Sequence, residues 1–307
     1  MNEREIETVG VVGIGAMGMG VAKRLLSQGW RVWVRDIRPD AEEEARVAGA
    51  RVAGSPAALT AHCDAVITLV VDDAQTEAVV FGLDGVAAGS RPGTVVLATS
   101  TLPPGWAAGA APRLRERQIE LIDAPCSGGP AKAHSGEMSM MLAAPAAALR
   151  RCERLLQTIS GKRFVVSEKH GDAAKAKLVN NMLAGINLVA ACEAFVLGLK
   201  LGLEAQQLFD LVQASSGGSW IFSDRMPRVL RNDYAARARL DILKKDLSLL
   251  IDVAKEQGYS VPLAQAAHAI FVRASEMGLG ELDDAAVAKG YAQWQGVVLP
   301  HLQRSLG

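Results

Sequence analysis

Gly13-Ile14-Gly15-Ala16-Met17-Gly18 is the stretch of this 307-residue chain that decides its fold. It ends an apolar, β-branched run, Val9–Ile14, and the residues after it, through Gln28, have the spacing of an amphipathic helix. A strand, a tight glycine turn and a helix in this order open a βαβ unit. Gly18 stands where a missing side chain lets the helix pack closely on the strand. The stretch therefore predicts the first turn of a parallel sheet covered by helices.

An acidic residue, Asp36, closes the next expected strand, Arg31–Arg35. A glycine turn at a helix N-terminus offers free amides to a pyrophosphate, and an acid at this distance binds the adenosine ribose. The joint pattern predicts NAD, with NADP less favoured because a carboxylate repels a 2′-phosphate, although Arg35 and Arg38 soften that preference. The expected cofactor contacts are Gly13, Ile14, Gly15, Ala16, Met17, Gly18 and Asp36. The alternative is a tight turn without a ligand, with Asp36 as a surface charge.

Short β-branched runs alternate with alanine-rich helical stretches from residue 9 to about residue 166, which predicts a Rossmann-type, doubly wound α/β domain. The expected strands are Val9–Ile14, Arg31–Arg35, Ala65–Val71, Thr94–Ala98, Glu120–Asp123, Met138–Leu142 and Arg163–Val166. Ser55-Pro56 is a good helix start, because serine caps free amides and proline needs no bonded N–H.

After Gly171 the strand-like runs disappear and helical periodicity continues almost to the end. The pattern from Asp172 to Leu201 predicts one helix on the order of 45 Å long. Later helices are expected to begin at Glu204, Asp241, Ser260-Val261-Pro262 and Asp283-Asp284, and Ser215–Ser219 reads as a flexible connection. We expect an NAD-binding Rossmann domain at 1–169 and an all-helical domain at 170–307, joined by the long helix.

The charge balance favours a small-molecule partner. Lys+Arg and Asp+Glu both number 33, so no net field attracts nucleic acid or a membrane surface. The acidic start, Met1–Glu5, does not fit a signal or transit peptide, and no segment approaches about 18 uninterrupted apolar residues. We expect a cytoplasmic protein.

The four cysteines lie far apart, without the spacing of a disulfide framework or a metal site. They are Cys63, Cys126, Cys152 and Cys192. Each is expected to be a small buried hydrophobe, and no metal ligands are predicted.

Two further motifs suggest chemistry. Asp123–Pro130 follows a strand and contains Ser127-Gly128-Gly129, whose hydroxyl and amides can hold a carboxylate, although such turns are also common loops. Lys177 and Asn181 are four apart and share one face of the long helix, which is otherwise apolar. The competing interpretation of Lys177 is a solvated surface lysine.

Taken together, these motifs resemble the β-hydroxyacid dehydrogenase family, which includes 3-hydroxyisobutyrate dehydrogenase and tartronate semialdehyde reductase. The likeness covers nearly the whole chain and rests on Val-Gly-Ile-Gly-Ala-Met-Gly, on Asp-Ala-Pro-Cys-Ser-Gly-Gly with its following Gly-Glu-Met, and on the Lys177–Met182 helix opening. The resemblance implies that Lys177 is the catalytic acid/base, that Asn181 helps to place the substrate, and that Ser127, Gly128 and Gly129 bind its carboxylate.

The same resemblance implies further cofactor contacts. Thr101 is implied to lie near the nicotinamide, and Lys245 to reach the cofactor from the helical domain, the alternative for Lys245 being an exposed charged helix face. Val70, Val71 and Gln75 are weaker candidates, because this chain has Val70-Val71-Asp72-Asp73 where the family usually has Leu-Pro. Cys126 replaces a residue that is commonly aliphatic. The resemblance also implies a homodimer or homotetramer built through the helical domain.

The implied reaction is reversible hydride transfer between NAD and a small 3-hydroxy carboxylate or its semialdehyde. An exposed amine, with a pKa of about 10.4, is a poor base at neutral pH, but burial and a neighbouring positive charge lower the pKa of an amine. Candidate substrates are 3-hydroxyisobutyrate, tartronate semialdehyde or glycerate, and four-carbon sugar acids such as L-threonate. The last is suggested by the ending Asp283-Asp284-Ala-Ala-Val-Ala-Lys289.

Alternative functions remain at this stage. An NADPH-dependent semialdehyde or imine reductase would share the fold, although related imine reductases generally lack the family lysine. A methyltransferase would use a glycine turn and an acid without needing the Lys177/Asn181 pair. A non-catalytic dinucleotide-sensing protein is the third alternative.

Overall fold

The computed structural model describes residues 5–300. Residues 1–4, most of the acidic N-terminal stretch considered above, lie outside this range, as do residues 301–307. The chain divides into two compact units between Lys177 and Leu178. This division lies inside the long helix, whereas the sequence analysis placed it just ahead of that helix, between residues 169 and 170.

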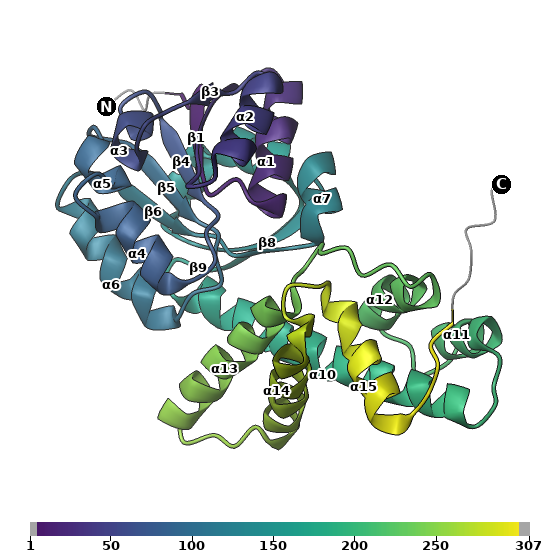
Figure 1. Cartoon of the computed structure of the whole chain (residues 1–307). Coiled ribbons are helices and arrows are strands. Elements are labelled where there is room, and N and C mark those ends of the chain that lie inside the picture. The colour runs from purple at the N-terminus through teal and green to yellow at the C-terminus, as the bar shows by residue number, and fades with distance from the viewer. Residues whose placement is uncertain (1–4, 301–307) are drawn as a thin grey trace. The chain divides into compact units, whose positions relative to one another are not determined.

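The first unit is built on a twisted sheet (Figure 1). The strands of its described residues are β1 (Thr8–Val12), β2 (Arg31–Arg35), β3 (Arg51–Val52), β4 (Ala65–Thr68), β5 (Val95–Ala98), β6 (Glu120–Asp123), β7 (Cys126–Ser127), β8 (Met138–Ala143) and β9 (Ser160–Ser167). Strands β3-β2-β1-β4-β5-β6 are parallel in this order. Since β1 pairs with both β2 and β4, the winding reverses there, and ligands of such sheets bind beyond the carboxyl ends of the strands at this point.

One edge of the sheet is mixed rather than parallel. Strand β8 runs antiparallel to both β6 and β7, while β9 runs parallel to β8. Only ten residues separate Ser127 from Met138, and a parallel crossover needs a dozen or more. Strand direction at this edge was not specified by the alternation of helices and strands, which shows only their order.

Helices cover both faces of the sheet, as predicted (Figure 1). The helices of this unit are α1 (Ala16–Ser27), α2 (Pro39–Val47), α3 (Pro56–Thr60), α4 (Asp73–Phe81), α5 (Val86–Gly89), α6 (Pro104–Arg115), α7 (Gly129–Ser135), α8 (Ala146–Arg151) and α9 (Glu153–Ile159). Helices α1, α2, α7, α8 and α9 pack on one face, and α3, α4, α5 and α6 pack on the other. At the start of α3, Ser55 Oγ accepts a hydrogen bond from the Ala58 amide at 3.1 Å, as its predicted cap should.

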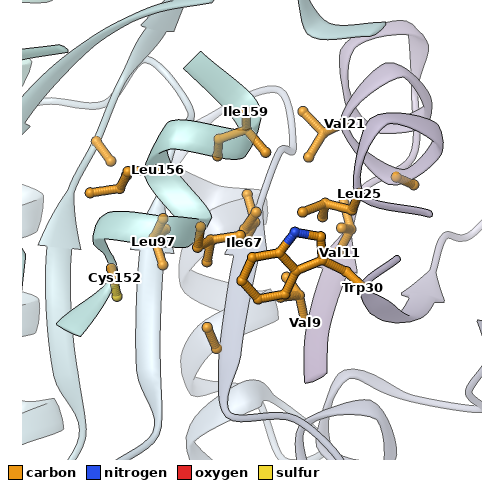
Figure 2. Close-up of a cluster of buried hydrophobic side chains, with 14 of the residues drawn as sticks. Val9, Val11, Val21, Leu25, Trp30, Ile67, Leu97, Cys152, Leu156 and Ile159 are labelled. Carbon is orange, nitrogen blue, oxygen red and sulfur yellow. The ribbon is translucent and has the colours of Figure 1, made fainter. Parts of the chain in front are cut away.

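Figure 2 shows the core beneath α1 and α9. Val9 and Val11 of β1 lie with Leu25 of α1 and Leu156 of α9 in one fully buried cluster. Burying a side chain of this size stabilises a fold by about 1.5–3 kcal/mol. This packing fixes α1, and with it the glycine turn that precedes the helix.

The predicted strand positions agree with the structure within a few residues. Arg31–Arg35 and Glu120–Asp123 match in full, and the other predicted runs overlap observed strands. The two-residue strands β3 and β7 were missed, because runs this short carry no hydrophobic period.

The regular elements among the described residues of the second unit are all helical, apart from one isolated bridge. Its elements are α10 (Asp172–Lys200, whose first turn belongs to the first unit), α11 (Ala205–Gln213), α12 (Trp220–Leu230), α13 (Leu240–Glu256), α14 (Pro262–Ala274), a π-helical turn η1 (Ser275–Leu279), a 3₁₀ turn η2 (Asp284–Ala286) and α15 (Val287–Gln295). The predicted helix starts agree with the structure within a residue or two, except that α12 was not predicted. A doubly wound sheet followed by helices, the predicted fold class, is confirmed.

One described helix, α10, is long and apolar enough to cross a membrane by length and composition alone. The sequence analysis passed over it because Asn187 and Glu193 interrupt its apolar run. Leu188, Cys192 and Phe195 of α10 are almost completely buried in the core of the second unit. These residues account for the side of α10 that packs into this core, while 44% of its most apolar 18-residue window is buried overall.

All four cysteines are buried and none forms a disulfide, as predicted. Burial raises the pKa of the Cys63 and Cys152 thiols to about 12. Within residues 5–300 no cluster of side chains could hold a metal ion.

Candidate active site

The glycine turn between β1 and α1 has the shape that a dinucleotide requires. Gly13 has a φ of +86°, and a Cβ there would lie 2.7 Å from the Leu69 carbonyl oxygen. A Cβ on Gly18 would lie 2.0 Å from the Gly13 carbonyl oxygen. A Cβ on Gly15, in contrast, would meet nothing within 4 Å. Two glycines are therefore needed for close packing, and the third borders open space.

Helix α1 begins at this open space with its N-terminus uncapped. Its N-cap is Gly15, no side chain caps the helix, and its first turn holds no acidic residue. The positive end of the helix dipole and the first amides, including those of Ala16 and Met17, are thus left for an external anion. These features fit a dinucleotide pyrophosphate.

Asp36 lies directly against the turn. Its Oδ2 accepts a hydrogen bond from the Ile14 amide at 2.7 Å, and its Oδ1 accepts one from the Arg38 amide at 2.9 Å. The Arg38 Nε lies 3.4 Å from the same Oδ1. A carboxylate has about four acceptor positions, so Asp36 keeps capacity for a ribose hydroxyl.

The ends of β4 and β5 meet the same turn. A Cβ on Gly13 would lie 2.9 Å from Val70 Cγ1, and Ser100 Oγ donates to the Val70 carbonyl at 2.8 Å. Thr101 follows Ser100 directly and is half-buried. The structure therefore brings Val70 to the glycine turn and the loop that carries Thr101 to Val70.

The segment Val70–Asp73, which departs from the family's usual Leu-Pro, contains the N-cap of helix α4. Asp72 Oδ1 accepts from the Gln75 amide at 2.7 Å and caps α4, while Gln75 Oε1 accepts from the Val71 amide at 3.2 Å. Two predicted cofactor residues, Val71 and Gln75, are thereby bonded to each other.

The Ser-Gly-Gly turn follows strand β7, which lies at the edge of the sheet opposite β3. Ser127 ends β7 and pairs with Ser139 of β8. Gly128 and Gly129 then adopt φ values of +131° and +75°, which side-chain-bearing residues rarely tolerate, and lead into α7. All three turn residues are half-buried. The turn thus needs both glycines and keeps its polar groups partly accessible.

Lys177 is not a solvated surface lysine, because only 7% of it is exposed. Burial raises the pKa of the Cys126 thiol, and the positive charge of Lys177 acts against that rise. The amine therefore lies within electrostatic range of the residue that precedes Ser127. Within the first unit, the structure brings Lys177 to the segment that holds the Ser-Gly-Gly turn.

The second unit joins the two remaining candidates through a residue that the sequence analysis did not assign. Asn181 Nδ2 donates to Asp246 Oδ2 at 2.6 Å, and Lys245 Nζ donates to Asp246 Oδ1 at 2.6 Å. Asp246 is 1% exposed. The sequence does contain a feature that could have identified Asp246. This acid has the helical spacing of the buried leucines of α13, such as Leu243 and Leu250, where an acid is unusual.

Comparisons with known proteins cover both units. Residues 8–167 match the model for the NAD-binding domain of 6-phosphogluconate dehydrogenase, and residues 171–291 match that for the NAD-binding domain of NADP-dependent 3-hydroxyisobutyrate dehydrogenase. The chain belongs to the β-hydroxyacid dehydrogenase family. As a member it is an oxidoreductase that uses a nicotinamide dinucleotide, and the family's substrates are small hydroxyacids.

Individual members of this family match over nearly their whole length. An L-threonate dehydrogenase of Cupriavidus necator is 44% identical over 95% of this chain and 97% of its own. An L-threonate dehydrogenase of Escherichia coli is 36% identical, with 95% and 96% covered. The crystal structure of a 3-hydroxyisobutyrate dehydrogenase from Salmonella typhimurium is 37% identical, with a TM-score of 0.86 over 92% of this chain and 99% of that one.

The glycine turn yields a paired prediction. Gly15→Ala fits the backbone (φ −61°, ψ −168°) and meets no atom, but its methyl group takes the space that the pyrophosphate would approach. Loss of charge-assisted hydrogen bonds worth about 1.5–3 kcal/mol would weaken NADH binding by about ten- to a hundredfold, with the free energy of unfolding unchanged. Fluorescence titration with NADH and thermal unfolding measure the two effects.

Gly18→Ala is the matched variant. Its Cβ would collide with the Gly13 carbonyl, so both the thermal midpoint and NADH affinity should fall. Equal NADH affinity in Gly15→Ala and the parent protein would contradict the assignment of the pyrophosphate to this turn.

Proposed function

We propose that this protein is an NAD-dependent dehydrogenase of a four-carbon sugar acid, L-threonate, with Lys177 as the acid/base residue. The observation that carries the chemistry is the buried Lys177 amine, within electrostatic range of Cys126, directly before the Ser-Gly-Gly turn. A buried cation beside a turn that can hold a carboxylate suits a small anionic substrate.

The residues have separate tasks in this proposal. Ser127, Gly128 and Gly129 hold the substrate carboxylate and so orient the carbon that bears the hydroxyl. Lys177 takes the hydroxyl proton during oxidation and returns it to the alkoxide oxygen during reduction. A bound nicotinamide supplies the hydride acceptor, which the protein only needs to orient. Asn181 places the substrate hydroxyl, and Asp246 keeps the Asn181 amide in one orientation.

The preference for NAD over NADP rests on charges near Asp36. Arg35 is half-buried, and its guanidinium pairs with Glu42 at 2.7 Å, where Glu42 also accepts from the Asp36 amide at 3.0 Å. Glu42 thus engages one of the two arginines that would soften the preference. Arg38 pairs with Asp36 and partly offsets its charge. The carboxylate remains next to the turn and disfavours a 2′-phosphate.

The choice of L-threonate is supported by the two relatives of that name, which match at 44% and 36% identity over almost the full chain. 3-Hydroxyisobutyrate and glycerate are the alternatives, since the Salmonella structure is named for the former. An imine reductase is disfavoured by the presence of Lys177.

Other parts of the proposal concern placement. Thr101 and Val70 would border the nicotinamide half of the cofactor, Val71 and Gln75 would lie nearby, and Lys245 would also contact the cofactor. We further propose that residues 1–169 form the NAD-binding domain, that residues 170–307 form the substrate and dimerisation domain, and that the protein acts in the cytoplasm.

We also propose a homodimer or homotetramer formed through the helical unit. Helix α10 is apolar but leaves Val179, Leu183 and Leu197 more than half exposed. Leu201 and Leu211, in and near the adjoining helix α11, are exposed as well. Apolar side chains of this size on adjoining helices favour burial against a second copy.

A substrate panel tests the proposed substrate. With NAD, L-threonate should give the highest kcat/KM, measured by absorbance of NADH, with 3-hydroxyisobutyrate and glycerate at least about tenfold lower, because one unmatched substrate group costs about 1–3 kcal/mol. A higher kcat/KM for either competitor would reject L-threonate but leave the reaction class intact.

Lys177→Ala tests the acid/base role. Removal of a general acid/base lowers turnover by about 10²–10⁴-fold, so kcat should fall by this amount while the Kd for NADH stays within about twofold. Lys175→Ala is the control: Lys175 is exposed, lies two residues earlier in α10 and pairs with Asp172 at 2.7 Å, so its loss should leave kcat unchanged. Full activity in Lys177→Ala would remove the proposed proton donor.

Asp36→Ala tests the cofactor preference. Loss of the ribose contact should weaken NAD binding by about tenfold and lower the NAD to NADP ratio of kcat/KM by at least as much. Asp40→Ala, in the first turn of α2 and exposed, removes the same charge without touching the turn and should change neither value. An unchanged ratio in Asp36→Ala would count against the ribose assignment.

A further inference from the structure

Asp123, the last residue of β6, has a buried carboxylate that is 2% exposed. Its Oδ2 accepts hydrogen bonds from the Gly171 amide at 2.8 Å and from the Ala174 amide at 3.3 Å. These amides stand at the N-terminus of α10, where a helix leaves its first N–H groups without partners in the helix. Asp123 therefore caps α10 from a strand 48 residues earlier in the chain.

A second contact joins the same two segments. The His170 Nε2 lies 2.8 Å from the Leu121 carbonyl oxygen; Leu121 is two residues before Asp123, and His170 is one residue before Gly171. Because the two contacts lie side by side, the start of α10 is fixed to β6 in direction as well as in position.

The two chain segments that leave this junction carry the proposed chemistry. Ser127 is the fourth residue after Asp123. Lys177 is the third residue after Ala174 in a rigid helix, a rise of about 4.5 Å. The Asp123 carboxylate thus links the segment that leads to the Ser127-Gly128-Gly129 turn with the helical turn that contains Lys177. Both lie within the first unit.

We infer that Asp123 is a positioning residue that holds the Lys177 amine in register with the Ser127-Gly128-Gly129 turn. The inference rests on the proposed acid/base role of Lys177. Asp123 itself touches neither substrate nor cofactor in this account; it acts through the first turn of α10.

The chemistry of the cap suits a rigid junction. Burial raises the pKa of Asp123, while the Gly171 and Ala174 amides and the charge of His170 act in the opposite direction. An anion at a helix N-terminus also gains from the helix dipole. Hydrogen bonds to charged groups are about twice as strong as neutral ones, so few other side chains would hold this turn as firmly. Displacement of a catalytic group by about 1 Å can cost a hundredfold in rate.

Two substitutions at Asp123 test the inference, with a matched control at Asp64. Asp64 is also buried (5% exposed), and its Oδ2 accepts from two amides, those of Glu7 and Thr8, at 3.1 and 3.0 Å. It precedes β4 and so lies at the opposite, amino end of the parallel strands. Asp64→Ala therefore removes a comparable buried acceptor far from the turn that carries Lys177.

The measurements are kcat and KM with L-threonate and NAD, or with whichever panel acid is oxidised fastest, the Kd for NADH, and thermal unfolding. Asp123→Ala should lower kcat by about tenfold to a hundredfold, with the Kd for NADH within about twofold. Asp123→Asn keeps an acceptor oxygen but loses the charge, so we expect partial rescue, with kcat about two- to fivefold below the parent. Asp64→Ala should lower the unfolding temperature but leave kcat of the folded protein unchanged.

Normal kcat in folded Asp123→Ala would overturn the inference, as would an equal loss of kcat in Asp64→Ala, which would show a merely structural effect. If Asp123→Ala does not fold, Asp123→Asn decides: a kcat equal to that of the parent overturns the inference. Lys177→Ala, measured in parallel, separates the two proposals. If it is active, the acid/base role fails; if it is inactive while both Asp123 variants are normal, only the positioning role fails.

Discussion

The hydrogen bonds between one buried carboxylate and the first turn of α10 are the constraint on which the site depends. The sheet supplies a rigid frame, since its central strands are fully buried on both faces. A helix that follows this sheet in the chain is held rigidly against it only if hydrogen bonds join the first turn of the helix to a strand. Asp123 forms that tie, and the amine of Lys177 follows within the same rigid segment.

Buried acids recur where this protein needs orientation rather than stability. Asp246 holds Asn181 and Lys245 in the second unit, and Asp284 accepts from Arg225 Nε at 2.5 Å where η2 meets α12. Replacing both partners of such a buried pair by apolar groups often costs nothing in stability, because the desolvation of the charges offsets their attraction, whereas removal of one partner alone is costly. These buried acids instead orient the side chains that they bind, since a hydrogen-bonded pair allows few geometries.

The sequence predicted what depends on local patterns. The glycine turn, Asp36 and the two-domain organisation follow from residue spacing. Lys177 and Asn181 proved buried, whereas the helix spacing alone left a solvated surface lysine as the competing interpretation and only the family resemblance favoured a catalytic one. Long-range pairings were not predictable, because nothing local tells that Asp123 caps a helix 48 residues later. The reversed edge of the sheet was missed for the same reason.

Helix α10 continues without a break through the division between Lys177 and Leu178. The two units are therefore not connected by a loop: successive backbone hydrogen bonds of one helix cross the border. A protease needs an extended, accessible segment of chain, and none exists there in the native state. Melting of the second unit would also fray the backbone hydrogen bonds of the helical turn that carries Lys177, so loss of that unit's core would loosen the amine as well.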